Sequence, residues 1–210
     1  MKREVLYEPY SIHFETLDAF PDKESRKNFF ELVFILSGTG KHCINKHSFS
    51  YSDNHMFLLT PQDCSQFWIE KTTRFFFLRF NNIYLKDDRI SKENIQRLEF
   101  ILENANHKPG CILKNQTDKT IVRPIVEALI REAVNKDVYH GDITAQLINT
   151  LIVIVARNIA KYLPPKIEET SELRIINVLN YIQANIYEPE KIRTESICKI
   201  FGFSENCLTL

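Results

Sequence analysis

Before about residue 90, hydrophobic residues come in short runs that are rich in β-branched and aromatic side chains and are separated by turn-like residues. The clearest run is Glu31–Ser37 (ELVFILS), which ends at Gly38-Thr39-Gly40, and we interpret these three residues as a turn. Five further runs follow at close spacing: His42–Asn45, Ser48–Ser52, His55–Leu59, Gln66–Ile69 and Arg74–Phe80. Many short strands at regular spacing predict an antiparallel sandwich or barrel.

After about residue 90, hydrophobic residues recur every three or four positions, which is the period of a helix. The pattern predicts one helix over Lys92–Asn104, a second around Ile121–Ile130 that ends near Lys136, and a third from about Asp142 to Lys161. The centre of the third helix, Leu151–Ala156 (LIVIVA), has no polar position in six residues. We therefore predict that this helix pairs two copies of the chain, with coverage of both its faces by strands of the same subunit as the alternative.

A break follows the third helix. Pro164 and Pro165 cannot continue it, and the polar stretch 163–170 predicts a linker. Ser171 can then serve as the N-cap of a further helix, whose apolar stripe runs from Leu173 to Ile186.

The last residues, Ile192 to Leu210 (IRTESICKIFGFSENCLTL), have the pattern of two short helices around a glycine. A helix over Thr194–Phe201, a turn at Gly202 and a second helix capped by Ser204 are typical of a helix-turn-helix. An ordinary helical hairpin with a glycine cap gives the same pattern and stays as the alternative. In the helix-turn-helix interpretation, four polar residues lie at the front of the recognition helix, which is the end that contacts base edges: Ser204, Glu205, Asn206 and Thr209.

Composition and charge narrow the class of protein. The 27 basic and 27 acidic side chains cancel, so no global field indicates nucleic acid or membrane as a partner. The five cysteines are odd in number and never have C-x-x-C spacing, which favours free thiols over a disulfide framework or a zinc site. The N-terminus lacks the apolar run and the cleavage site of a signal peptide, so we expect a soluble, cytoplasmic protein.

Three stretches occur in an order that is typical of one family. SELRIINVLNYIQANIYEPEKIRTESICKIFGFSENCLTL contains a first helix ending in YIQANIYE, followed by the phrase I-x-x-E-x-I-C-x-x-F-G-F-S-x-x-x-L. Upstream lie FFELVFILSGTGKHCIN and FLLTPQDCSQFW. The first stretch resembles the start of the DNA-binding domain of AraC/XylS-family transcription regulators, and the other two resemble that family's cupin-like sensor. The resemblance implies an α+β protein with an N-terminal cupin-like antiparallel β-barrel, a helical dimerisation subdomain and a partial C-terminal helix-turn-helix.

The sequence also departs from that family. The family's DNA-binding domain has two helix-turn-helix units, whereas this sequence has only the first and ends inside its recognition helix, so we expect a truncated chain. From Leu163 to Leu210 there are five basic and seven acidic residues, a net charge of −2. Because DNA affinity depends on the neutralisation of phosphates, we expect this stretch to bind no promoter specifically at physiological salt.

A metalloenzyme is the rival class, because cupin-like barrels can hold a metal through H-x-H-x-x-x-x-E and a later His. Glu31 matches the acidic position, but Glu24 and Arg26 occupy the two His positions, and Ser65 lies near the later one. We therefore expect no metal, no cofactor and no enzyme activity.

Polar and aromatic side chains inside the predicted barrel are candidates for an effector pocket: Glu31, His42, Gln66 and Trp68. The sequence thus predicts a sensor barrel over 1–90, a helical dimerisation subdomain over 91–162, a linker over 163–170 and an incomplete helix-turn-helix over 171–210. The predicted function is ligand-responsive, sequence-specific regulation of transcription. Its partners would be DNA, an unidentified small-molecule effector and a second copy of the chain. The alternative is a stand-alone cupin-like protein that binds an effector or dimerises and has lost DNA binding.

Overall fold

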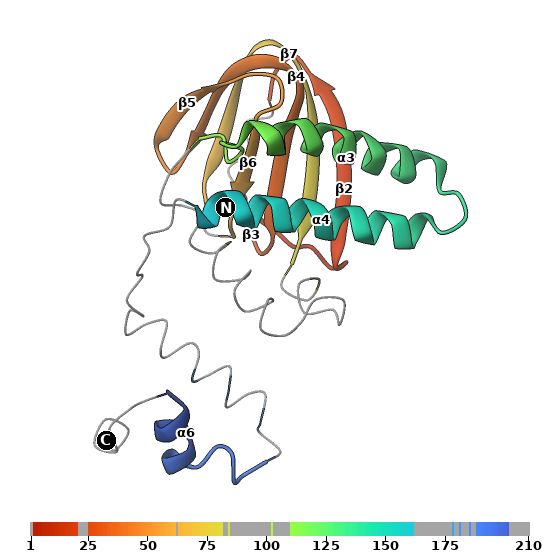
Figure 1. Cartoon of the computed structure of the whole chain (residues 1–210). Coiled ribbons are helices and arrows are strands. Elements are labelled where there is room, and N and C mark those ends of the chain that lie inside the picture. Colours follow the sequence, from red (N-terminus) through yellow and green to blue (C-terminus); the bar gives the residue numbers. More distant parts are fainter. Residues whose placement is uncertain are drawn as a thin grey trace. The chain divides into compact units, whose positions relative to one another are not determined.

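Two long antiparallel strands, β4 (Phe30–Ile44) and β7 (Ser65–Phe80), form the centre of a five-stranded sheet in this computed structural model (Figure 1). β2 (Tyr10–Leu17) pairs with β7. On the other side of β4, β6 (Met56–Leu59) pairs with its first half and β5 (His47–Tyr51) with its second half. All these pairings are antiparallel, as the sequence predicted.

The structure describes residues 2–20, 25–61, 63–81, 84, 102, 110–161, 178, 181, 185 and 188–201. The chain divides into two units, Met1–Leu163 and Pro164–Leu210. The first unit contains the sheet, a short parallel pair formed by β1 (Lys2–Glu4) and β3 (Ser25–Lys27), and two long helices. With the third described helix, in the second unit, the chain is α+β, which confirms the predicted class. The division of the sequence at residues 90 and 170 stays a prediction.

The segment Gly38-Thr39-Gly40 is not a turn, so that prediction was wrong. β4 continues through it with shifts in register against β7, and Gly38 has a φ of +113°, a conformation that favours glycine. At Gly40, a Cβ atom would lie 2.1 Å from the carbonyl oxygen of Trp68. The two glycines therefore let β4 pass close to β7 and bulge without ending, which joins two predicted strands into one.

Other predicted boundaries also change. Gln66–Ile69 and Arg74–Phe80 belong to the single strand β7, and the sequence did not predict β2 at all. The predicted turn at Asn45-Lys46 is confirmed, because both residues have positive φ, as a tight hairpin requires. Among the described strands, β2 and β5 are the two ends of an open path. The antiparallel sheet of the predicted cupin-like barrel is therefore present, but the barrel is not closed in the part of the chain that the structure describes.

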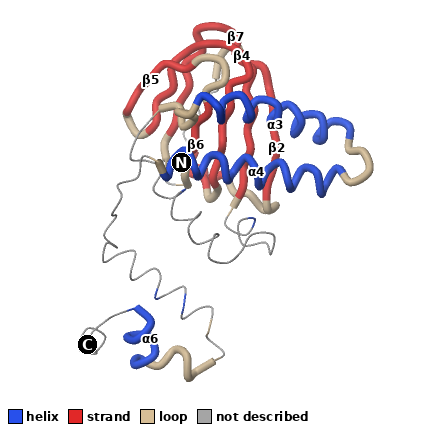
Figure 2. Tube along the Cα trace, in the orientation of Figure 1, coloured by secondary structure: helices blue, strands red, loops and turns tan. Residues whose placement is uncertain are grey.

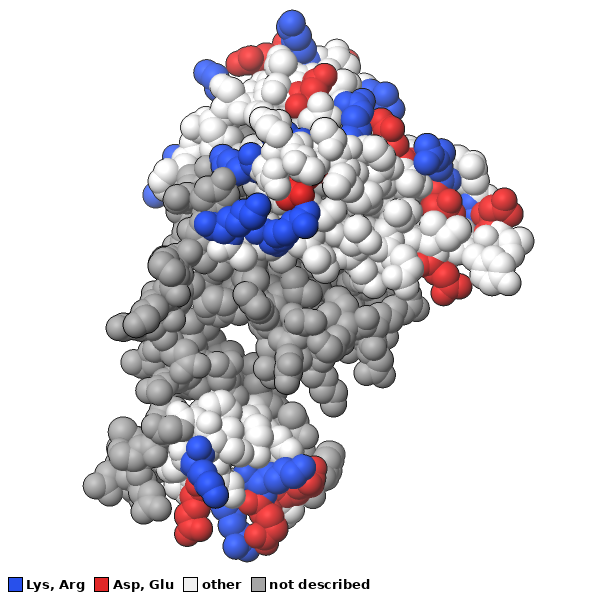
Figure 3. Space-filling model, in the orientation of Figure 1, with Lys and Arg blue, Asp and Glu red and all other residues white. Residues whose placement is uncertain are grey.

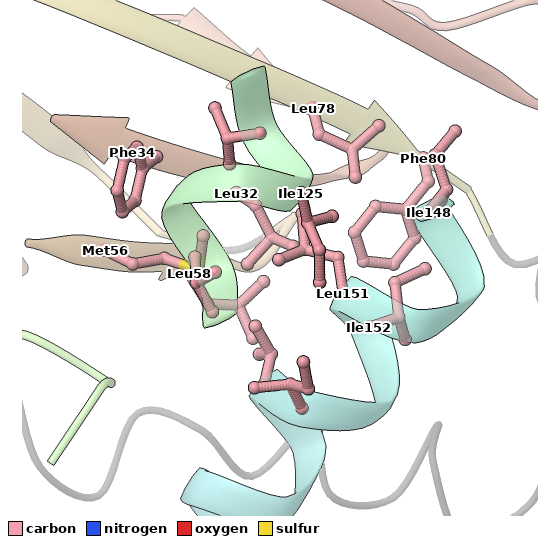
Figure 4. Close-up of a cluster of buried hydrophobic side chains, with 14 of the residues drawn as sticks. Leu32, Phe34, Met56, Leu58, Leu78, Phe80, Ile125, Ile148, Leu151 and Ile152 are labelled. Carbon is pink, nitrogen blue, oxygen red and sulfur yellow. The ribbon is translucent and has the colours of Figure 1, made fainter. Parts of the chain in front are cut away.

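Helices α3 (Gln116–Asn135) and α4 (His140–Ala160) cover one face of the sheet (Figure 2). Both confirm helices predicted from hydrophobic periodicity. The side chain of Asn115 caps α3 by accepting a hydrogen bond from the backbone N–H of Thr117 at 3.1 Å. Figure 4 shows residues of both helices packed against alternate residues of β4, β6 and β7: Ile125, Ile148, Leu151 and Ile152 against Leu32, Phe34, Met56, Leu58, Leu78 and Phe80.

The apolar centre of α4 is largely covered by its own chain. Five of the six residues in Leu151–Ala156 are buried, and only Val153 is half exposed. The chain itself therefore buries most of the surface for which we had predicted a second subunit, and dimerisation through this helix stays a prediction. By length and composition α4 could also cross a membrane, but 56% of the apolar window is buried inside this unit, as in the core helix of a folded domain.

In the second unit, the described helix is α6 (Thr194–Phe201), at the predicted position. Ile197 and Cys198 are buried, and the rings of Tyr181 and Phe201 meet edge to face at 5.6 Å. The predicted helix over Lys92–Asn104 lies outside the described residues except for Leu102, which is helical and buried, and most of the helix after Ser171 also lies outside them. The second helix of the predicted helix-turn-helix also lies outside them.

Candidate functional site

The face of the sheet opposite the helices is lined with aromatic rings, and we call it the inner face. Along β4, Val33 and Ile35 point to this face, and after the glycine bulge His42 and Ile44 do so. The bulge thus switches the inward positions from odd to even numbers. From the neighbouring elements, seven aromatic side chains join them: Phe20, Phe49, Tyr51, Phe57, Phe67, Phe75 and Phe77.

The sheet curls strongly enough to bring its two halves together. Phe57 pairs in register with Val33, nine positions before His42 on β4. Nevertheless, the ring centroids of Phe57 and His42 are only 4.7 Å apart. The inner face is therefore a folded aromatic cluster rather than a flat surface.

His42 lies in the middle of this cluster and is fully buried. Its ring stacks on Phe67 with a centroid distance of 3.7 Å and an angle of 9° between the planes. The rings of Phe49 and Phe57 meet it nearly at right angles, at 5.4 and 4.7 Å. Neither Nδ1 nor Nε2 of His42 has a hydrogen-bond partner in the described part of the chain.

Burial, and to a lesser extent the positive charge of Lys27, lowers the pKa of His42 to about 3. The imidazole is therefore neutral at physiological pH, with one N–H donor and one nitrogen acceptor. A buried polar group without a partner is costly, and such groups are uncommon in folded proteins. His42 is thus a ready hydrogen-bonding group in an apolar setting.

A charged cluster of Lys27, Glu31 and Arg79 lies at one edge of the inner face. Glu31 is buried and accepts hydrogen bonds from the ammonium group of Lys27 and, at 2.8 Å, from Nε of Arg79. Both cations also lie over the ring of Phe29, the guanidinium group 5.4 Å from its centroid. Two cations against one carboxylate leave this edge with a formal charge of +1.

The four predicted pocket residues do not share one environment. Glu31 and His42 lie on the inner face, as just described. Gln66 and Trp68 flank Phe67 on β7, and adjacent strand residues point to opposite faces. Trp68 is 46% exposed and Gln66 is half-buried. The register therefore turns Gln66 and Trp68 away from the face that carries His42.

Sequence reasoning missed the residues that surround His42. Phe67, which lies between the predicted residues Gln66 and Trp68, is the stacking partner of His42. Counting back in steps of two from Phe77 and Phe75 along β7 would have indicated that Phe67 faces inward. Lys27 and Arg79 were missed because neither belongs to a motif. The predicted DNA-contacting residues Ser204, Glu205, Asn206 and Thr209 lie outside the described residues.

The inner face offers little to a metal ion. No group of three or more His, Cys, Asp or Glu side chains converges among the described residues. Both oxygens of Glu31, the one residue that matches the metal-binding pattern, accept hydrogen bonds from cations. What the inner face offers instead is one neutral hydrogen-bonding ring among apolar surfaces.

The described part of the second unit is balanced in charge. Residues 188–201 include three acidic residues and three basic ones. Two surface ion pairs, Lys191–Glu188 at 2.7 Å and Arg193–Glu190 at 2.8 Å, join charges of opposite sign. Figure 3 shows basic and acidic side chains intermixed on the visible face of this unit. This segment presents no one-sided basic surface for phosphates.

No known family pattern and no curated protein matches the chain. Among solved structures, the AraC-like transcriptional activator CuxR is similar, with 14% identity and a TM-score of 0.49 over 94% of this chain. The chain spans 65% of the length of CuxR. ToxT from Vibrio cholerae, solved with a bound unsaturated fatty acid, has 11% identity and a TM-score of 0.46 over 95% of this chain and 71% of ToxT. A cupin protein from Bacteroides fragilis has 17% identity and a TM-score of 0.33 over 40% of this chain and 71% of its own. At these identities and TM-scores, the likenesses do not assign the chain to a family.

Proposed function

We propose that this protein is a ligand-responsive regulator whose first unit binds a small organic molecule at the inner face of the sheet. The observation that carries the proposal is His42, a fully buried imidazole with both ring nitrogens unpartnered among aromatic rings. An apolar site with a few well-placed polar groups is the usual form of a small-molecule site. Helices α3 and α4 pack on the opposite face of the sheet, so no described helix lies on the inner face.

Binding fits His42 better than catalysis does. A general base is normally oriented by a second polar group, and the imidazole of His42 has none in the described part of the chain. Its pKa of about 3 is also far from the neutral value that serves proton transfer at physiological pH. The same features suit a residue that completes its hydrogen bonds with a ligand.

The second unit would supply DNA recognition, a proposal supported by the sequence phrase from Ile192 to Leu210 and by α6 at its predicted position. The balanced charge of residues 188–201 implies weak binding to phosphates. The alternative, an effector-binding protein that does not bind DNA, is favoured by the same charge balance. The two proposals differ only in what ligand binding controls.

Two measurements on the full 210-residue chain test this function. A thermal-denaturation screen against a library of small organic molecules should find compounds that raise the midpoint with increasing concentration. If no chemical class raises it, the inner face is an ordinary core and the sensor proposal is wrong.

Selection from random DNA duplexes, at low ionic strength and with a bound compound, should then enrich a common sequence that the same chain does not bind specifically at physiological salt. Low ionic strength is chosen because phosphate contacts are strongest there. Enrichment supports the regulator. A chain that binds its compound yet enriches no sequence even at low ionic strength favours the stand-alone alternative over the regulator.

A further inference from the structure

The aromatic rings around His42 differ in how firmly they are held. Phe57 and Phe67 are buried on strands β6 and β7. Phe49 is only partly buried, and its strand, β5, pairs with β4 alone among the described strands. Residues on both sides of Phe49, Ser48 and Ser50, are exposed. Phe49 is therefore the ring in contact with His42 that can leave the cluster at the lowest cost.

We propose that the inner face binds a neutral, planar aromatic molecule with one hydroxyl group, of the phenol class, in the place of the Phe49 ring. The hydroxyl group would bond to the imidazole of His42. This inference rests on the proposed function and narrows it to a class of ligand.

The shape of the ligand follows from the ring that it displaces. The centroid of Phe49 lies 5.4 Å from that of His42, with 76° between the planes. Removal of this ring leaves a flat space the size of one six-membered ring, bordered by Phe57 at 5.5 Å. A single aromatic ring restores the edge-to-face contacts that the cluster loses.

The polarity of the ligand follows from His42 itself. A neutral imidazole offers one donor and one acceptor, and a hydroxyl group can bond to either. A carboxylate in the same place would lose its hydration among apolar rings, which costs far more than the burial of a hydroxyl group. A hydrocarbon ring would fill the space but leave the His42 nitrogens unpartnered.

Three probes of similar size separate these possibilities: p-cresol, toluene and benzoate. Dissociation constants are measured by NMR titration of the full chain from the signals of the probe itself, which works for every variant, and the ring signals of His42 report whether the probe contacts this residue. We expect p-cresol to bind about tenfold more tightly than toluene, because one buried hydrogen bond contributes about 1.4 kcal/mol, a factor of ten. The His42 nitrogen signals should shift with p-cresol and not with toluene.

Variants then test the two residues separately. Phe49→Ala should bind p-cresol about tenfold more tightly than the unaltered chain, because the ligand no longer has to displace a ring. If that variant does not fold, Phe49→Leu gives a smaller gain in the same direction. His42→Phe should bind p-cresol and toluene equally. His47→Phe, an exposed histidine on the same hairpin, is the matched control and should leave both constants unchanged.

The possible failures are distinguishable. If benzoate binds best and Lys27→Met weakens it, the ligand is an anion held at the charged edge, and the phenol class is wrong while effector binding stands. If p-cresol binds no more tightly than toluene, or if His42→Phe binds p-cresol as tightly as the unaltered chain does, His42 does not hold the ligand. If no probe binds even to Phe49→Ala, the phenol class is wrong, and the library screen alone decides whether the inner face binds any effector.

Discussion

Replacing His42 with phenylalanine should make the ligand-free protein more stable. The substitution keeps a flat ring in contact with Phe49, Phe57 and Phe67 and removes the two unpartnered nitrogens. Most substitutions of fully buried residues destabilise a protein, so a gain at this position is an unusual outcome. It would mean that the histidine serves binding at the expense of stability.

The size of the gain can be worked from the surroundings of the ring. At about 1.5 kcal/mol for each unsatisfied buried polar atom, the two nitrogens of His42 together cost about 3 kcal/mol. The nearly perpendicular ring of Phe57, 4.7 Å away, can accept an N–H and recover roughly 0.5–1 kcal/mol. The larger phenylalanine ring loses about 1 kcal/mol to tighter packing. The net gain is about 1 kcal/mol, or about 2–4 °C in the melting midpoint of a unit of this length.

The gain should grow as the pH falls. The pKa of His42 is about 3 in the folded protein against 6.5 in the unfolded chain. Between these values the unfolded state binds a proton that the folded state does not. The stability of the unaltered protein is therefore complete above pH 6.5 and falls toward pH 3, by up to about 5 kcal/mol at about 1.4 kcal/mol per pH unit. The difference in unfolding free energy between His42→Phe and the unaltered protein should therefore be about 2 kcal/mol larger at pH 5 than at pH 7.5.

Urea denaturation at pH 7.5 and at pH 5 measures both effects. Burial and two lysines lower the pKa of His55 as well, and this contribution is common to all the variants. His47→Phe, the exposed control, should match the unaltered protein at both pH values. A His42→Phe variant that is less stable at pH 7.5, or whose advantage does not widen at pH 5, would refute the reasoning.

Three further predictions concern the frame around the site. Gly40→Ala should lower the unfolding free energy by more than about 2 kcal/mol in urea denaturation, because the new Cβ would lie 2.1 Å from a backbone oxygen of β7; an unchanged midpoint would show that β4 can shift. Asp118→Ala should lower the unfolding free energy by about 2 kcal/mol in calorimetry, because the buried carboxylate of Asp118 accepts a hydrogen bond from Asn158 at 2.6 Å. The control, Glu127→Ala, removes an exposed ion pair and should lower the unfolding free energy by less than about 0.5 kcal/mol. If α4 pairs two copies through its exposed side, Val153→Glu places a charge in that interface and should give a folded monomer in light scattering. If the variant is still a dimer, the exposed side of α4 is not the interface.

The sequence predicted the elements whose pattern is local. The helical period gave α3 and α4 to within two residues at their C-terminal ends, and the Asn45-Lys46 turn was evident from its residue types. The sequence failed where pairing decides the structure. Gly38 and Gly40 look like a turn in isolation, and only the close approach of β7 makes them a bulge inside a strand.

The pairing of strands, which the sequence pattern does not reveal, also limited the prediction of the site residues. Composition suggested that polar residues on strands line a pocket, and Glu31 and His42 do lie on the inner face. Gln66 and Trp68 were chosen without knowledge of the register, and Phe67 between them proved to face His42. A shift of one residue exchanges the two faces of a strand, so the choice among neighbours needs the pairing with β4.

The glycine bulge of β4 also lies between the inner face and the helices. The backbone N–H of Gly38 donates to the carboxylate of Asp53 at 2.8 Å. Next to Asp53, the side-chain oxygen of Asn54 accepts from Arg123 of α3 at 2.9 Å, and the same guanidinium group donates to the carbonyl of Leu36 at 3.2 Å. Arg123 thus ties α3 to Leu36, in the irregular part of β4, and to Asn54, in the turn that follows β5. Strand β5, which carries Phe49, leads directly into Asp53 and Asn54, so these hydrogen bonds join the turn after β5 to the bulge of β4 and to α3.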